Sequence, residues 1–152
     1  VLFRSKQLIE SCISNGINYI DTASVYGNSE GVIGDVLSNI KSPNIQVITK
    51  INIDQSISEG SSEFEIDYAV DFQIKQSINQ LKSVTLDTVL LHRASNLTDY
   101  IGRVWTRLLK LKQDGLIKNL GVSVQTPNEL NIALEYEKVE LIQLPFNILD
   151  AR

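Results

Sequence analysis

The chain has 152 residues, 43% of them hydrophobic, and a formal net charge of -4. This composition is typical of a globular protein, and the mild acidity disfavours nucleic acid and anionic membranes as partners. No apolar run approaches the ~18 residues that a membrane span needs. The single cysteine, Cys12, excludes an internal disulfide, so we expect a cytoplasmic location.

The two ends of the chain lack the features of a closed domain. Val1–Ser5 match what a common sequencing adapter encodes when translated, so we expect residues 1–5 to be an artefact. The chain stops at "PFNILDAR" without a terminating pattern. We therefore expect residues 6–152 to form one incomplete domain.

Helical and strand patterns alternate through the first half of the chain. Residues 6–16 carry Leu8, Ile9, Cys12 and Ile13 on one helical face, with Gly16 as the stop. Residues 17–21 read as a strand, 29–40 as a helix and the β-branched run 45–51 as a second strand. Residues 52–67 are polar, acidic and rich in serine, which predicts a long loop.

The alternation continues to the end of the chain. Helical spacing over residues 68–82 places Ile74, Ile78 and Leu81 on one face, and residues 88–92 follow as a strand. The next predicted helix, 100–115, buries Ile101, Val104, Trp105, Leu108 and Leu111 and closes at Gly115. A strand is predicted over 117–124, and Thr126, Pro127 and Glu129 predict a capped helix over 126–136. The last strand is expected over 141–146.

This order of elements predicts an α/β fold with a parallel sheet covered by helices. Two architectures are compatible with it, an open doubly wound sheet and a (β/α)8 TIM barrel. A G-x-G-x-x-G turn after a strand is absent, which weakens the dinucleotide-binding doubly wound alternative.

Polar residues stand at the ends of the predicted strands. Asp21, Lys50 and His92 end the first three, Ser123 lies near the end of the fourth, and Gln143 lies within the fifth. In a barrel, catalytic groups come from the carboxyl ends of several strands and from the loops that follow. We therefore expect these side chains to converge on one rim, where Tyr26 from the first loop folds over them.

This set of residue types is suited to proton delivery. A free tyrosine, with a pKa near ~10, is a poor acid at neutral pH, but a nearby ammonium stabilises the phenolate. A carboxylate would hold the lysine in place, and a histidine could bind a carbonyl oxygen, so the set could protonate an oxygen that gains negative charge. Each residue alone has a simpler structural explanation, and the prediction depends on their order on successive βα units.

The motifs resemble those of the aldo-keto reductase superfamily. "NGINYIDTASVYGNSEGVIG" resembles its first signature, and "VITKI", "LDTVLLHR", "GVSV" and "LIQLPFN" resemble its lysine, histidine, serine and glutamine strands. The resemblance implies a partial (β/α)8 barrel and reduction of an aldehyde or ketone with NADPH as cofactor, with NADH as the alternative. It implies a catalytic tetrad of Asp21, Tyr26, Lys50 and His92, with Tyr26 as the general acid. Ser123 and Gln143 would hold the nicotinamide carboxamide.

The chain departs from the family pattern in two ways. Val124 follows Ser123, where family members often have asparagine, and only five strands are predicted. The first strand and the last two of the family barrel are missing, so we expect the chain alone to be inactive. Two other functions remain open: a barrel enzyme with Lys50 as a Schiff-base nucleophile, and a regulatory homologue that binds the cofactor without turnover. The expected partner is a small carbonyl substrate; the substrate's identity and the oligomeric state are not predicted.

Overall fold

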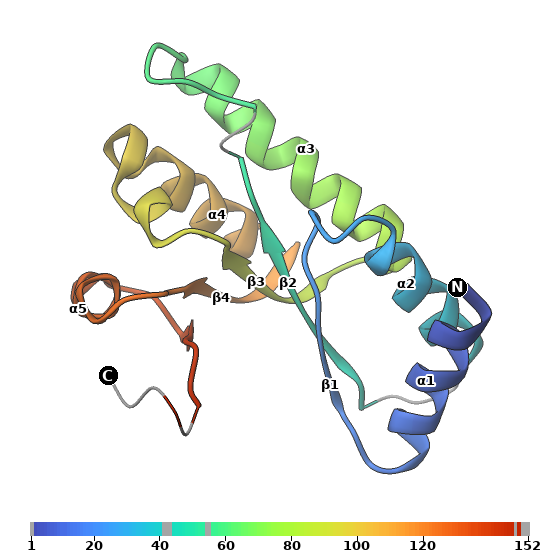
Figure 1. The fold of residues 1–152 in the computed structure, drawn as a ribbon. Coiled ribbons are helices and arrows are strands. Elements are labelled where there is room, and N and C mark those ends of the chain that lie inside the picture. Colours follow the sequence, from blue (N-terminus) through green and yellow to red (C-terminus); the bar gives the residue numbers. More distant parts are fainter. Residues whose placement is uncertain (1, 41–43, 54–55, 148, 150–152) are drawn as a thin grey trace.

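The computed structural model describes residues 2–40, 44–53, 56–147 and 149 (Figure 1). Val1 of the expected artefact and the last residues of the expected domain, 150–152, lie outside the described residues. Helices and strands alternate from the first element to the last, as predicted: α1 (Leu2–Ser14), β1 (Tyr19–Asp21), α2 (Ser29–Asn39), β2 (Gln46–Ile51), α3 (Glu63–Leu81), β3 (Leu86–Leu91), α4 (Arg103–Gln113), β4 (Ile117–Ser123), α5 (Pro127–Glu135) and β5 (Leu141–Gln143).

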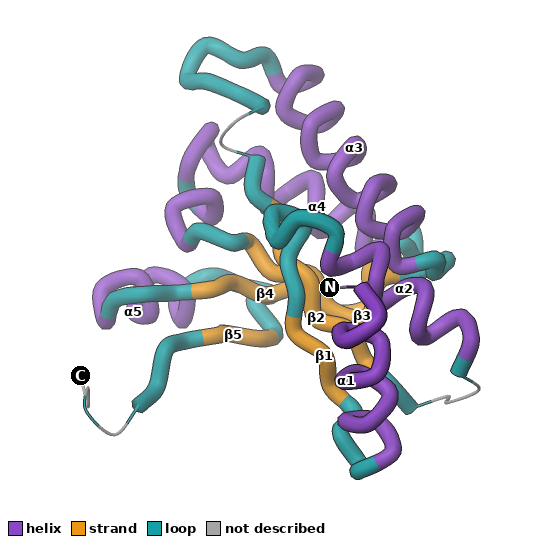
Figure 2. Tube along the Cα trace, turned by 45° about the vertical axis from the view of Figure 1, so that its right-hand side comes forward, coloured by secondary structure: helices purple, strands orange, loops and turns teal. Residues whose placement is uncertain are grey.

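The five strands form one parallel sheet in the order β1-β2-β3-β4-β5. A doubly wound sheet reverses its strand order at a switch point, whereas here each strand pairs with the next one along the chain. The helices surround this curved sheet (Figure 2). The fold is therefore a half-barrel, a partial (β/α)8 barrel, and the barrel prediction is confirmed.

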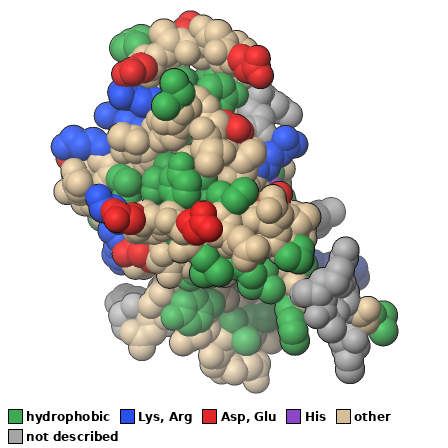
Figure 3. All heavy atoms as spheres, turned by 90° about the vertical axis from the view of Figure 1, so that its left-hand side faces the viewer, with side chains coloured by type: hydrophobic (Ala, Val, Ile, Leu, Met, Phe, Trp, Pro, Cys, Tyr) green, Lys and Arg blue, Asp and Glu red, His purple; other side chains and the backbone are tan. Residues whose placement is uncertain are grey.

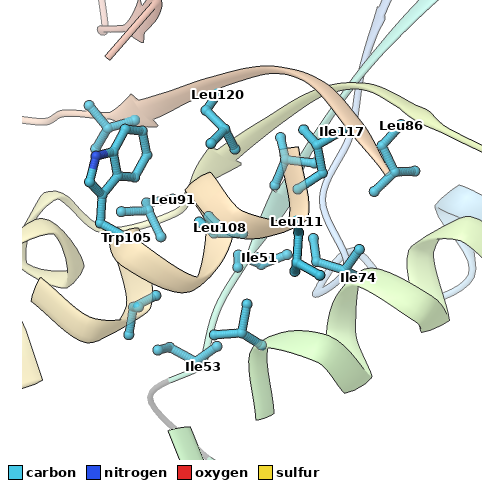
Figure 4. Packing of buried hydrophobic residues seen from close by; sticks show 14 of the residues in the cluster. Ile51, Ile53, Ile74, Leu86, Leu91, Trp105, Leu108, Leu111, Ile117 and Leu120 are labelled. Atoms are coloured by element: carbon cyan, nitrogen blue, oxygen red, sulfur yellow. The ribbon is translucent and has the colours of Figure 1, made fainter. Parts of the chain in front are cut away.

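The core lies between the outer face of the sheet and the helices (Figure 4). Leu91 and Leu120 from the strands pack there with Ile74 of α3 and Trp105 and Leu108 of α4, all at most 3% exposed. Thr49 and Ile51, the residues on either side of Lys50, face the helices. Successive side chains of a strand point to opposite faces of the sheet. Lys50 itself therefore points into the barrel.

Helix α3 begins earlier than the sequence predicted. Residues 63–67 were expected to be loop, but Ser62 and Glu65 form a capping box that starts the helix at Glu63. Two bidentate ion pairs then fix α3 against α4, with N–O distances of 2.6–2.8 Å. Arg103 binds Asp67 and Arg107 binds Asp71, one helical turn apart. The capping box predicted at Thr126 and Glu129 is confirmed.

Helix α4 begins later than predicted, and the prediction that Ile101 is buried is wrong. Tyr100, Ile101 and Gly102 all have positive φ angles, so the chain turns left-handed before α4 starts at Arg103. This turn places Ile101 fully in solvent, at 101% relative exposure. The face that carries α4 and α5 shows further hydrophobic side chains at its surface (Figure 3). Leu134 of α5 is 67% exposed.

Candidate active site

Lys50 is the centre of the polar cluster at the carboxyl ends of the strands. Its side chain is only 3% exposed, and its Nζ donates to Asp21 Oδ1 at 2.8 Å, Asp21 Oδ2 at 2.7 Å and the Thr22 carbonyl at 2.9 Å. A buried ammonium is tolerated only when it is paired and hydrogen-bonded, and these three bonds use all three of its protons. Lys50 is therefore held in one position.

Tyr26 lies on the loop that follows β1, and the backbone of this loop places it above Lys50. Ser24 N donates to Lys50 O at 3.0 Å, and Tyr26 N donates to Ala23 O at 3.0 Å. Gly27 then takes a φ of +60°, which glycine adopts without the steric cost that other residues meet. As a result, the Tyr26 ring centroid is 5.5 Å from Lys50 Nζ, and half of the tyrosine remains exposed.

His92 contacts Tyr26 from the third strand. Its backbone N donates to Ile51 O at 3.0 Å, which continues the parallel pairing one residue beyond β3. The two rings meet edge to face, with centroids 5.9 Å apart and planes at 83°. Tyr26 therefore has the lysine ammonium near its face and the imidazole beside it.

Gln143 and Ser123 complete the rim from the last two strands. They are paired in register, and Gln143 Nε2 donates to Asp21 Oδ1 at 3.1 Å. This bond joins β5 to β1, the two edge strands of the described sheet, because the sheet curves until their inner faces approach. The structure thus brings Asp21, Tyr26, Lys50, His92 and Gln143 into one cluster. Ser123, 7% exposed, lies beside Gln143.

Sequence reasoning did not identify Glu30 and Thr49 as supporting residues. Glu30 lies in the first turn of α2 and is only 5% exposed; its Oε1 accepts a 2.6 Å bond from Thr49 Oγ1. At the base of the same loop, the Thr22 and Ser29 hydroxyls are 2.7 Å apart. These bonds join both ends of the Tyr26 loop to each other and to β2, the strand of Lys50. The sequence signal for Glu30 was an acidic residue at the start of a helix. Such residues are usually exposed, so the signal does not indicate a buried supporting residue.

The described residues show neither a metal-binding cluster nor a membrane-spanning helix. They contain no group of three or more His, Cys, Asp or Glu side chains that could hold a metal ion. None of the helices described is both long and apolar enough to cross a membrane.

Comparison with known proteins identifies the family. The model of the aldo/keto reductase family matches residues 4–152. The chain belongs to this family. Among its curated relatives, the uncharacterized oxidoreductase YqkF of Bacillus subtilis is 27% identical over 151 residues, which cover 98% of this chain and 49% of YqkF. Glyoxal reductase of Bacillus subtilis is 32% identical over 117 residues, which cover 76% of this chain and 38% of that protein. NADH-specific methylglyoxal reductase of Escherichia coli is 26% identical over 152 residues, which cover 89% of this chain and 45% of that protein.

Solved structures agree with this family assignment. The holo form of the aldo-keto reductase AKR11C1 from Bacillus halodurans superposes with a TM-score of 0.76 at 27% identity, covering 99% of this chain and 49% of that one. The chain therefore spans about half the length of the relatives that it matches.

Proposed function

We propose that the protein reduces an aldehyde or ketone to an alcohol with a nicotinamide cofactor. One observation carries this proposal: a buried lysine, bound by an aspartate on one side, lies close to a half-exposed tyrosine ring that also contacts a histidine. The family assignment supports the same chemistry, because three relatives are named as glyoxal or methylglyoxal reductases.

In the proposed reaction, Tyr26 donates its phenolic proton to the carbonyl oxygen of the substrate. Negative charge that develops on the phenolic oxygen is favoured by the Lys50 ammonium, and Asp21 fixes that ammonium through both carboxylate oxygens. His92, beside the tyrosine, is placed to hydrogen-bond the carbonyl oxygen and orient the substrate. A bound nicotinamide would supply the hydride.

The rim has groups that fit a nicotinamide carboxamide. The Ser123 hydroxyl can donate or accept, and Gln143 Oε1 can accept while its Nε2 binds Asp21. These two side chains come from neighbouring strands in register, so they face the same side of the sheet. We propose NADPH as the cofactor, with NADH as the alternative that the name of the Escherichia coli relative supports.

The geometry of Lys50 disfavours the Schiff-base alternative. A nucleophilic lysine needs a neutral amine with its lone pair directed at the substrate. The three N–H groups of Lys50 instead have acceptors in Asp21 and Thr22, and the side chain is buried beneath Tyr26. Its position suits an electrostatic role.

The test is Tyr26→Phe in the full-length gene product, with Tyr19→Phe as the matched control. Tyr19 begins β1, at the end of the strand away from Asp21, and is similarly exposed, at 55% against 51% for Tyr26. Tyr26→Phe should lower kcat/KM for a small aldehyde by about 10²–10⁴-fold, the usual contribution of a general acid, and leave cofactor Kd unchanged. Tyr19→Phe should leave both unchanged. Near-normal turnover by Tyr26→Phe would show that this tyrosine is not the general acid. A wild-type protein that binds the cofactor but shows no turnover would indicate a regulatory homologue.

A further inference from the structure

Helix α3 carries three large aromatic side chains on its solvent face. Phe64, Tyr68 and Phe72 are spaced four residues apart and are 78%, 63% and 56% exposed. This spacing aligns them along one face of a helix, and the Tyr68 and Phe72 rings stack with centroids 6.5 Å apart. We call these three residues the α3 stripe. A contiguous exposed aromatic surface of this kind commonly marks a protein–protein contact.

None of the described residues covers the α3 stripe. Ile66, Val70 and Ile74 on the opposite face of α3 are buried in the core. The two flanks of the helix pack against α2 and α4. Figure 1 shows α3 along the outer side of the molecule. Any additional strand would pair at the β1 or β5 edge of the sheet, on the far side of the neighbouring helices from the stripe. The stripe therefore lies on the outer face of the described part of the fold.

A shallow hollow adjoins the α3 stripe. It has a volume of about 260 Å³ and is lined by all three aromatic residues together with Ser56, Ser61, Glu65 and Ala69. Ser56 and Ser61 belong to the loop before α3. This surface is thus ridged and recessed, which suits interdigitation with another helix.

The arrangement of side chains around the α3 stripe is self-complementary. Val70 is fully buried, like Ile74 and Ser77, so the solvent face lies opposite it, and we place the two-fold axis at the point opposite Val70. A two-fold axis through that point exchanges residues equally far from position 70, which pairs Tyr68 with Phe72 of a second copy. It also pairs Glu65 with Lys75. The Tyr68 and Phe72 rings of the two copies thus meet one another, Phe64 faces Gln76, and an acid meets a base.

Glu65 and Lys75 are both able to form this intersubunit ion pair. The capping bonds of Glu65, from Ser62 N and Ser62 Oγ, use only Oε2, which leaves the lone pairs of Oε1 available. The pKa of Glu65 is lowered by these bonds, first by the one from the Ser62 backbone, so Glu65 is a carboxylate at neutral pH. Lys75 is exposed and makes no ion pair to another described residue.

We propose that the α3 stripe is the interface of a symmetric homodimer, in which two α3 helices pack antiparallel. A two-fold contact needs the same patch on both subunits, and the pairing about position 70 provides it. Burying four aromatic rings, Tyr68 and Phe72 from each subunit, supplies the apolar area that drives association, and the Glu65–Lys75 pairs at the rim fix the register.

The first test measures association of the full-length gene product by sedimentation velocity over a range of concentrations. Phe72→Glu places a carboxylate in the stripe and should raise the dimer Kd by about 30-fold or more, the loss expected for a central aromatic anchor. Val84→Glu is the matched control, because Val84 is 87% exposed but follows α3 outside the stripe. Its dimer Kd should match that of the wild type. A monomeric wild type, or a dimer that Phe72→Glu leaves intact, would overturn the proposal.

The second test checks the register by disulfide cross-linking in a Cys12→Ser background. Tyr68→Cys and Phe72→Cys proteins are oxidised separately and then as a mixture. The two-fold axis brings position 68 of one subunit to position 72 of the other, so the mixture should form the disulfide-linked dimer and each protein alone should form less. Equal cross-linking in all three samples, or none in the mixture, would overturn the antiparallel register.

Discussion

Replacing Asp21 by asparagine should destabilise the fold more than replacing its partner Lys50 by methionine. In Asp21→Asn the ammonium of Lys50 stays buried, at 3% exposure, without its counter-charge. In Lys50→Met the buried charge itself is removed and a flexible apolar chain of similar length takes its place. The remaining carboxylate of Asp21 is 44% exposed and still accepts from Gln143, so water and the amide compensate for the lost lysine.

The size of each effect follows from this asymmetry. Removing one partner of a buried ion pair costs about 3–5 kcal/mol. Here the exposure of Asp21 weakens the pair, and the Thr22 carbonyl continues to accept from Lys50, so we expect about 2–3 kcal/mol for Asp21→Asn. For Lys50→Met the loss should be about 1 kcal/mol or less, mainly from the unpaired Thr22 carbonyl. The double variant should resemble Lys50→Met.

Urea unfolding of the three variants in the full-length gene product provides the assay. The free energy of unfolding is obtained from the midpoint and slope, and an unchanged slope shows that the difference lies in stability. A Lys50→Met protein that is less stable than Asp21→Asn would refute the reasoning, because it would show that the ammonium stabilises the fold rather than requiring its partner.

Three further predictions concern the rest of the chain. Ile101→Gly should stabilise the protein by about 1 kcal/mol, because Ile101 has a left-handed backbone and a fully exposed side chain; thermal unfolding measures this, and an equal or lower Tm would contradict it. Burial raises the pKa of Glu140, but bonds from Lys112 and Leu120 N together lower it below its usual 4.5, so its stabilising effect is present above that pH and is lost as pH falls through the lowered value. The stability difference between wild type and Glu140→Gln should therefore shrink below about pH 4.5, and a difference that grows on acidification would be inconsistent with it. Finally, the 152-residue chain expressed alone should oxidise no NADPH with simple aldehydes, because its β1 and β5 edges are unpaired in the described sheet; turnover by a stable monomer would show that the half-barrel is self-sufficient.

The strand-end residues of the site could be predicted from the sequence because they depend on local patterns and topology. Alternating βα units place Asp21, Lys50 and His92 at the same end of a parallel sheet, and the structure confirms this position. The bond between Gln143 and Asp21 could not be predicted, because it depends on how far the sheet curves. The burial of Glu30 likewise depends on how α2 packs against Thr49.

The errors in the helices have local causes. The capping signal of Ser62 and Glu65 was present, but the polar and serine-rich composition around it favoured a loop. At Ile101 the apolar spacing continued the helical pattern, but three successive left-handed residues break the helix there. A pattern of side chains does not report backbone angles of this kind.

Hydride transfer is the most direct test of the proposed function. The full-length gene product is incubated with a small aldehyde and NADPH deuterated at the transferring carbon of the nicotinamide, and the alcohol is analysed by mass spectrometry. We predict that deuterium appears on the former carbonyl carbon, and that Tyr26→Phe abolishes most of this transfer while Tyr19→Phe does not. Alcohol without deuterium, transfer that persists in Tyr26→Phe, or a borohydride-trapped adduct on Lys50 would contradict the proposal.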